Sequence, residues 1–168
     1  MKCAIDVHYV IDFAYVGIVE FESWDDSRPR SVHRIEIESN ESYQPGEFYR
    51  RELPPILAAL KKVKIEYTDI VIDGYVHLAS PLKWGLGMHL SHAMNDQTNI
   101  LGIAKSRLPI ASDYIRVYRG KSKRPLYVSS NNYREFEMQD IVSSMHGSYR
   151  LPTLIKAVDQ VSKGISLT

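Results

Sequence analysis

Two short apolar segments of the chain each carry an aspartate, and these acids constrain how the chain can fold. Asp6 interrupts the apolar segment 3–7, and Asp73 closes the segment 70–73 and is followed by a glycine. An acid in or at the end of a buried strand is costly unless a positive group pairs with it. Two such acids suggest a shared partner, and a hard divalent cation prefers oxygen ligands. Glu52, at the start of a helical pattern, could add a third carboxylate.

The first forty residues predict an antiparallel meander of three strands. Residues 3–10 and 14–21 form apolar strands, and the polar segment 23–30 carries a proline typical of a turn. Residues 33–38 alternate between inward and outward side chains with the period of two that is typical of a half-buried strand. Because the connections are short, we expect the three strands to pair with their neighbours in antiparallel order.

The remainder of the chain alternates helices with strands. Leucine and isoleucine side chains at 53, 56, 57 and 60 recur at helical spacing, which predicts a helix from residue 48. Similar patterns predict helices at 86–94, 138–145 and 152–163, strands at 69–73 and 99–104, and a hairpin of 114–118 with 126–129. A strand–helix–strand order with short connections implies parallel pairing. The sequence therefore predicts one α/β domain, residues 1–168, whose mixed sheet has an antiparallel meander followed by parallel strands and is flanked by helices.

Composition limits the classes of protein and of partner. The net charge is +1, from 21 basic and 20 acidic residues, so any nucleic-acid binding must use local patches or a bound metal. Cys3 is the single cysteine, which excludes an internal disulfide framework and indicates a reducing compartment such as the cytoplasm. No apolar run approaches the roughly 20 residues of a membrane span. Asp6, His8 and Asp12 interrupt any signal-peptide core, so we expect a cytoplasmic protein without membrane contact.

Seven short motifs occur in a fixed order along the chain, and together they resemble the endonuclease V family. They are Ala-Ile-Asp-Val at 4–7, Tyr-Gln-Pro-Gly at 43–46, Arg-Glu-Leu-Pro at 51–54, Val-Ile-Asp-Gly at 71–74, Gly-Leu-Gly-Met-His-Leu at 85–90, Gly-Ile-Ala-Lys-Ser at 102–106 and Tyr-Arg-Leu-Pro at 149–152. The resemblance begins at the first strand, without the family's usual N-terminal extension. It implies a ribonuclease H-like fold and a Mg²⁺-dependent endonuclease that cuts DNA or RNA near deaminated bases, chiefly inosine.

The resemblance also assigns roles to charged residues. Asp6, Glu52 and Asp73 would hold Mg²⁺, or Mn²⁺ in its place, and the metal would polarise the phosphate and supply a nucleophilic water. Lys105 would stabilise the charge that develops on the phosphate. Asp159 stands where the family has an acidic or histidine residue near the metal. Each residue also has a plain structural interpretation, as a turn cap, a solvated helix acid or an ordinary strand-end lysine.

Further residues are expected to contact nucleic acid or the base. Tyr43 resembles the family's wedge residue, whose ring replaces lost base stacking, and Pro45 would stiffen its loop. In the segment after Asp73, the nucleic-acid-binding candidates are Gly74, Tyr75, His77 and Ser80. His89 matches a family histidine, although a lone histidine on an amphipathic helix is commonly structural. The basic hairpin tip 119–124 could follow phosphates or serve solubility alone.

Two departures from the family pattern bear on activity. The segment 73–82 is one residue longer than expected, with Val76 at the place of a second glycine, Ser80 at that of a histidine and Leu82 at that of an arginine. Asn131-Asn132 replaces a glycine–histidine pair. Either His77 is recruited into the site or the histidine's contribution is lost. The alternatives to the implied enzyme are therefore a nuclease with altered base preference and a weak or inactive nucleic-acid-binding protein.

Overall fold

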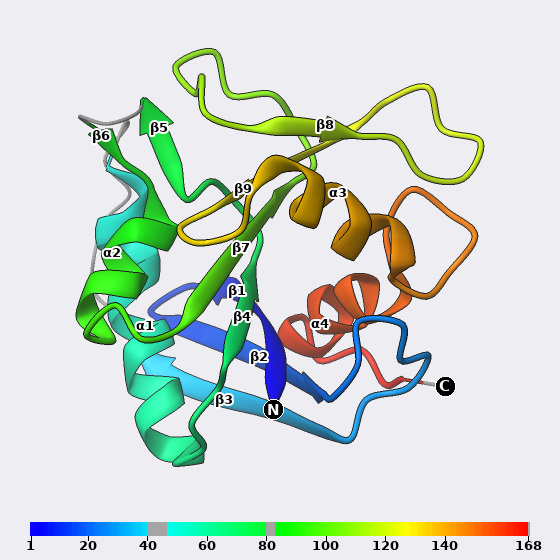
Figure 1. Cartoon of the computed structure of the whole chain (residues 1–168). Helices are drawn as coiled ribbons and strands as arrows, with labels where there is room; N and C mark the ends of the chain where they lie inside the picture. Colours follow the sequence, from blue (N-terminus) through cyan, green and yellow to red (C-terminus); the bar gives the residue numbers. More distant parts are fainter. Residues whose placement is uncertain (40–46, 80–82, 168) are drawn as a thin grey trace.

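The computed structural model describes residues 1–39, 47–79 and 83–167, and its main feature is a seven-stranded mixed sheet (Figure 1). The strand order is β3-β2-β1-β4-β7-β9-β8, and β5 pairs with β6 in a separate two-stranded sheet. The strands are β1 Lys2–Val10, β2 Phe13–Phe21, β3 Ser31–Glu38, β4 Asp69–Ile72, β5 His77–Ala79, β6 Lys83–Trp84, β7 Asn99–Ala104, β8 Ile115–Val117 and β9 Leu126–Ser130. The helices are α1 Phe48–Val63, α2 Leu86–Ala93, α3 Glu135–Ser144 and α4 Thr153–Ser162.

The pairing of the strands confirms the predicted order of antiparallel and parallel segments. β1, β2 and β3 form the antiparallel meander, with β1 paired to β2 along its whole length. β4 then pairs in parallel with β1 on one side and with β7 on the other. β9 closes onto β7 in antiparallel order and carries β8 at its outer edge.

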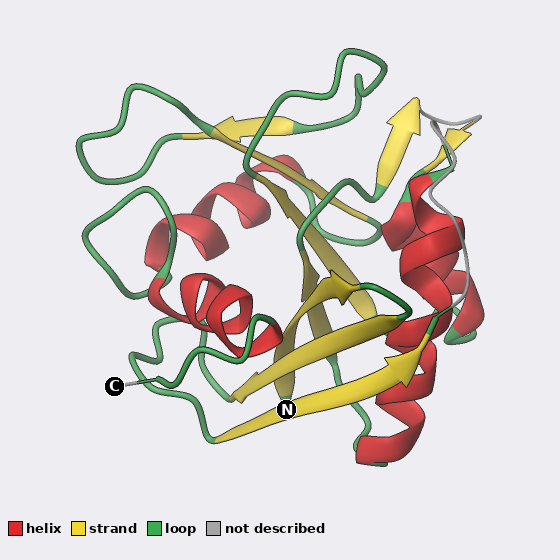
Figure 2. Cartoon of the chain, turned by 180° about the vertical axis from the view of Figure 1, so that it is seen from behind, coloured by secondary structure: helices red, strands yellow, loops and turns green. Residues whose placement is uncertain are grey.

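Helices cover both faces of the sheet, and the side chains of β1 alternate between the two cores (Figure 2). Cys3 and Ile5 point toward the core beneath α1 and α2, whereas Ala4 belongs to the core beneath α3 and α4. α4 lies so close to β2 that a Cβ added to Gly17 would stand 2.8 Å from the backbone nitrogen of Ser162. No helix in the described part of the chain is long and apolar enough to cross a membrane.

Three strands finish near one another at a single edge of the sheet, and this edge positions the candidate site. The last parallel pair of β1 and β4 is Ile5 with Ile72, so β1 continues past β4 and places Asp6 beside the end of β4. Asp73 follows directly after β4, and Lys105 follows directly after β7. The sequence did not indicate the β5–β6 pair, whose strands have three and two residues.

Candidate functional site

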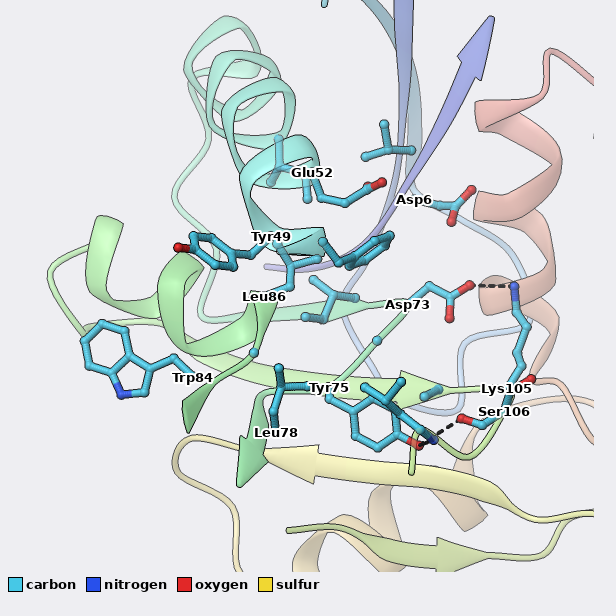
Figure 3. Close-up of a pocket in the computed structure, with 18 of the residues that line it drawn as sticks. Asp6, Tyr49, Glu52, Asp73, Tyr75, Leu78, Trp84, Leu86, Lys105 and Ser106 are labelled. Atoms are coloured by element: carbon cyan, nitrogen blue, oxygen red, sulfur yellow. Dashed lines mark hydrogen bonds and ion pairs between the residues drawn. The ribbon is translucent and has the colours of Figure 1, made fainter. Parts of the chain in front are cut away.

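Lys105 and Asp73 form an ion pair where β7 and β4 end. The Lys105 Nζ donates to Asp73 Oδ2 at 2.7 Å and lies 3.5 Å from Asp159 Oδ1 of α4 (Figure 3). Burial lowers the pKa of Lys105, but the hydrogen bond and charge of Asp73, with the charges of Asp159 and Asp6, outweigh burial and raise it. Lys105 is therefore held in its charged form between two carboxylates.

Asp6 occupies the same edge and is held from α4. The Ser162 hydroxyl donates to Asp6 Oδ2 at 2.5 Å, and Asp6, Asp73, Lys105 and Asp159 line one small hollow against that helix. Burial raises the pKa of Asp6, the hydrogen bond from Ser162 lowers it, and the charge of Asp73 raises it further. The net upward shift of the Asp6 pKa therefore comes mainly from burial, with the charge of Asp73 adding to it.

Glu52 reaches this edge from the opposite face of the sheet. It lies in the second turn of α1, is only 7% exposed, and extends from the helix toward Asp6 (Figure 3). Burial, followed by the charge of Asp6, raises its pKa to about 8, although Arg51 and a hydrogen bond with Tyr9 act in the opposite direction. A carboxyl with this pKa is partly protonated at neutral pH and gains from any nearby positive charge.

The three carboxylates have the chemistry of a divalent-cation site, because hard cations prefer oxygen ligands and relieve the repulsion among them. Asp6 and Asp73 lie on the same side of the sheet edge, as a shared cation requires. In the described ranges, however, no group of three or more His, Cys, Asp or Glu side chains is close enough to hold a metal ion, and Asp73 is engaged by Lys105. The shared metal site therefore stays a prediction.

A hollow of about 620 Å³ extends from the carboxylates between α1, α2 and the loop after β7. Asp6, Glu52, Asp73 and Lys105 line one end of this hollow. Apolar and aromatic side chains line the remainder, among them Tyr49, Tyr75, Leu78, Trp84 and Leu86 (Figure 3). The site thus joins a charged end to an apolar compartment.

Tyr75 fixes the loop that forms one wall of this hollow. Its hydroxyl donates to the carbonyl of Ser106 at 2.8 Å and accepts from the backbone N–H of Leu108 at 3.2 Å (Figure 3). These bonds hold the loop that begins at Lys105. Tyr75, which the sequence suggested as a nucleic-acid-binding residue, therefore lines the hollow and also positions its wall.

In the segment after Asp73, Val76 departs from the family pattern, and its side chain packs in the core. Val76 is fully buried beside α2, and a Cβ added to Gly87 would stand 2.6 Å from its side chain. Val76 is thus directed into the core, whereas Gly74, which has a positive φ, and Tyr75 line the hollow. His77 is not among the lining residues of the hollow. Tyr43, Pro45, Ser80 and Leu82 lie outside the described residues.

His89 stands behind the aromatic wall. Its ring stacks on Tyr49 at 3.6 Å between centroids, and the ring of Trp84 meets it edge-on at 5.3 Å. Burial and the neighbouring His92 lower the pKa of His89. Tyr49 and Trp84 line the hollow, so His89 supports two of its wall residues.

Two arginines at this edge were not recognised as structural from the sequence. Arg119, expected at an exposed basic tip, is only 6% exposed and donates to the carbonyls of Tyr149 at 2.9 Å and Gly147 at 3.0 Å, as well as to those of Arg150 and Met145. Arg150 donates to the carbonyl of Pro125 at 2.8 Å and to that of Lys105. The interpretation of Arg119 as a phosphate contact was therefore wrong, because its guanidinium is used within the fold.

Asn131, at the position of the family's glycine–histidine pair, also has a structural role. Its side-chain oxygen accepts from the N–H of Ile100 at 2.8 Å, and its amide nitrogen donates to Ser91 at 2.9 Å and to the Thr98 carbonyl at 3.1 Å. These bonds join β9 to β7 and α2. At this position, where the chain departs from the family pattern, Asn131 thus satisfies the hydrogen bonds of buried backbone groups.

Comparisons with known proteins agree with this arrangement. The endonuclease V family model matches residues 3–160. The chain is 28% identical over 140 residues to an endonuclease V of Nostoc punctiforme, covering 71% of this chain and 62% of that protein. It is 29% identical over 143 residues to one of Clostridium acetobutylicum, covering 70% and 59%. The chain therefore spans about three fifths of the length of these curated relatives.

Solved structures give the same result for the fold. Endonuclease V of Ciona intestinalis, in complex with a DNA that contains an inosine, superposes with a TM-score of 0.78 at 18% identity and covers 97% of this chain and 84% of that one. The Streptomyces avermitilis protein superposes with a TM-score of 0.73 at 22% identity, covering 97% and 79%. These likenesses confirm the ribonuclease H-like fold expected from the sequence.

Proposed function

The chain belongs to the endonuclease V family, and from this premise we propose that it is a metal-dependent nuclease that hydrolyses a phosphodiester bond near a deaminated base. The observation that carries the proposal is the convergence of Asp6, Glu52, Asp73 and Lys105 at one end of a hollow. A phosphate at the charged end would place a neighbouring base at the apolar end. A volume of about 620 Å³ is within the range of small-ligand sites.

Asp6, Glu52 and Asp73 are the residues that would hold Mg²⁺ or Mn²⁺. When bound, such an ion polarises a phosphate oxygen and lowers the pKa of a water. The raised pKa values of Asp6 and Glu52 support this assignment, since burial, and after it the charge of a neighbouring acid, disfavours their charged forms and a bound cation would offset both. Ser162 would keep the Asp6 carboxylate oriented.

Lys105 would supply positive charge to the phosphate. Its charged form is favoured by Asp73 and Asp159, and its backbone is fixed by Arg150. A fixed donor aimed at developing charge is among the largest contributions to catalysis. Asp159, which also accepts from Lys163 at 2.8 Å, would help to orient Lys105.

The apolar compartment would receive the base. Tyr75 and Gly74 line it, and an aromatic ring beside a base replaces stacking that the base loses on leaving a helix. We further propose that Tyr43, stiffened by Pro45, is the wedge, and that His77 and Ser80 contact nucleic acid near the site. DNA or RNA containing inosine is the proposed substrate, as in the Ciona complex with inosine-containing DNA.

A nucleic-acid-binding protein that cuts weakly, or a nuclease with another base preference, is the second candidate. It is favoured by the segment after Asp73, where Val76 turns into the core and His77 is not among the residues lining the hollow. The second candidate retains the apolar compartment but loses the imidazole that the family places near it.

Cleavage of matched oligonucleotides separates these candidates. DNA and RNA strands with and without one inosine are incubated with Mg²⁺, with Mn²⁺ and with a chelator, beside the Asp6→Asn variant. We expect cutting only with metal, only by the unaltered protein, and faster on the inosine strands. Tight binding of inosine strands without metal-dependent cutting would support the second candidate, and equal cutting of all strands would remove the base preference.

A further inference from the structure

Positive charge is concentrated in one continuous segment of the chain. Residues 105–134 contain eight of the 21 basic residues and one of the 20 acidic residues, a net charge of +7. The rest of the chain therefore carries a net charge of −6 although the whole chain is near neutral. Such asymmetry is typical of proteins that bind nucleic acid through one local surface.

Most of the cations in this segment are available at the surface. Arg107, Arg116, Lys121, Lys123 and Arg124 are exposed, and none of them forms a salt bridge with another described residue. The remaining ones are used within the fold, such as Arg119 in backbone hydrogen bonds and Arg134 in an ion pair with Glu137. Lys121, Lys123 and Arg124 lie in the β8–β9 turn, and we name residues 121–124 the basic arm.

The basic arm is fixed to the fold at both ends. Arg119 binds carbonyls of the loop between α3 and α4, and a Cβ added to Gly120 would stand 2.4 Å from the Ser148 carbonyl. Within the arm, Ser122 donates to the Arg124 carbonyl at 3.0 Å and accepts from the Arg124 N–H at 3.1 Å. The arm therefore presents its cations on a shaped turn packed against a loop.

The C-terminal end of the basic arm lies beside the candidate site. Arg150 donates to the carbonyls of both Lys105 and Pro125, so Pro125, the residue directly after the arm, lies next to Lys105. Four extended residues span at most roughly 14 Å, so the backbone of the arm lies within about this distance of Pro125. One strand of DNA rises about 3.4 Å per nucleotide, so this reach corresponds to about four nucleotides.

We propose that the basic arm binds phosphates of the nucleic acid on one side of the bond that is cut, within about four nucleotides of it. This inference rests on the proposed function, because it takes the charged end of the hollow as the place of the reacting phosphate. Nucleic acid is favoured over an acidic protein because the arm continues the positive charge of Lys105 and Arg107, which line the hollow. The arm contributes affinity and orientation without reading sequence.

The test is the salt dependence of binding in a chelator, where no cutting is needed. The binding constant of a fluorescein-labelled duplex with one inosine is measured between about 50 and 200 mM salt for three proteins. They are the wild type, the arm variant Lys121→Gln/Lys123→Gln/Arg124→Gln and the control Lys61→Gln/Lys62→Gln/Lys64→Gln. The control loses the same charge from exposed residues at the end of α1. Each lost phosphate contact reduces the slope of log K against log salt by about 0.9, so we expect a reduction of about 2–3 for the arm variant and none for the control.

Shortening the duplex gives a second measurement. Removing nucleotides from one side of the inosine should abolish the difference between wild type and arm variant, whereas removing them from the other side should preserve it. An arm variant whose slope equals that of the control, or that responds equally to shortening on both sides, overturns the proposal. If the slope changes as expected but no metal-dependent cutting occurs, the arm stands and the proposed nuclease function fails.

Discussion

Both ends of the central strands bury acids, but the surroundings of these acids are opposite. At the end where β4 and β7 finish, Asp6, Glu52 and Asp73 line one hollow. At the other end, Glu20 of β2 is 3% exposed and Asp69 of β4 is 5% exposed. Buried acids therefore occur at both ends of the sheet, and burial alone does not distinguish a site from a structural support.

The acids at the second end are surrounded by hydrogen-bond donors. The Tyr67 hydroxyl donates to Glu20 at 2.6 Å, and the His33 ring nitrogen lies 3.1 Å from the same oxygen. Burial, together with the bond to Glu20, raises the pKa of Tyr67 and keeps it a donor. Glu20 is thus satisfied by groups that the fold itself supplies.

Asp69 is satisfied in the same way. It accepts from Thr68 at 2.8 Å and from the Asn99 amide at 3.0 Å, as well as from the Tyr133 hydroxyl. Buried acids among donors therefore stabilise the fold.

At the other end, Asp6 accepts from Ser162 and Asp73 pairs with Lys105. Glu52 differs, because burial and the charge of Asp6 raise its pKa to about 8 despite Arg51 and the hydrogen bond with Tyr9.

The largest expected effect separates the two ends by activity. Asp6→Asn and Asp73→Asn should reduce cleavage of an inosine strand by roughly 10²–10⁴-fold, since metal-dependent charge stabilisation contributes several kcal/mol. The free energy of unfolding of Asp6→Asn should stay near wild type, because the lost charge also removes repulsion with Asp73, whereas Asp73→Asn also loses its ion pair with Lys105 and should be somewhat less stable. Asp69→Asn is the matched control and should keep its activity while losing stability. Equal loss of activity in all three variants would contradict a functional difference between the two ends of the sheet.

The pH dependence of the free energy of unfolding is the next test of the comparison, through the raised pKa of Glu52. Glu52 has a folded-state pKa of about 8, above the value of 4.5 in an unfolded chain, so the folded state binds its proton more tightly. The stability from this proton is complete below about pH 4.5 and is lost as pH rises through about 8. With a chelator present, the free energy of unfolding of the wild type should therefore fall by a few kcal/mol relative to that of Glu52→Gln between about pH 4.5 and pH 8. This follows from about 1.4 kcal/mol per pKa unit. Parallel stability curves for the two proteins would contradict this interpretation.

At the other end, removal of an acid should cost stability and spare activity. Glu20→Leu leaves the buried Tyr67 hydroxyl without its acceptor, which should cost about 1–3 kcal/mol in urea unfolding. The double variant Glu20→Leu/Tyr67→Phe removes both partners and should recover part of the loss. Cleavage per folded molecule should not change. A double variant as unstable as the sum of the singles would show that the pair is not coupled.

Tyr75→Phe should give the smallest effect. The variant keeps the ring in the hollow and removes the hydroxyl that binds Ser106 and Leu108. We expect a loss of about 0.5–1.5 kcal/mol in stability. Because the same loop begins at Lys105, kcat should fall more than KM rises. A change in KM alone would assign Tyr75 to base contact without a positioning role.

The strands and the site edge were predictable because their signals are local. Short apolar runs located β1, β4 and β7, and the acids and the lysine at their ends lie at one edge because neighbouring parallel strands end together. Glu20 also interrupts an apolar strand, but the sequence does not show whether this acid belongs to a site or to the core. Its partner Tyr67 is 47 residues away in sequence, so only the folded chain shows that this acid is satisfied.

The remaining misses have the same cause. Arg119 is one of four cations in six residues, and a local charge count reads it as exposed. Its carbonyl partners lie 26 to 31 residues later in the chain. The β5–β6 pair consists of strands too short for a periodic pattern. These features depend on contacts between residues far apart in the sequence, which local sequence patterns do not show.

The contact of α4 with the first hairpin has a consequence for how the protein is made. Asp6 and Ser162 are separated by 156 residues, and at a synthesis rate of about 5–20 residues per second the helix follows the hairpin by roughly 8–30 s. During that interval the face of β1 and β2 that receives α4 is uncovered, and Asp6 has no Ser162 to orient it. A nascent chain should thus complete the candidate site only after α4 leaves the ribosome, and premature termination before α4 should yield an aggregation-prone fragment with an incomplete site.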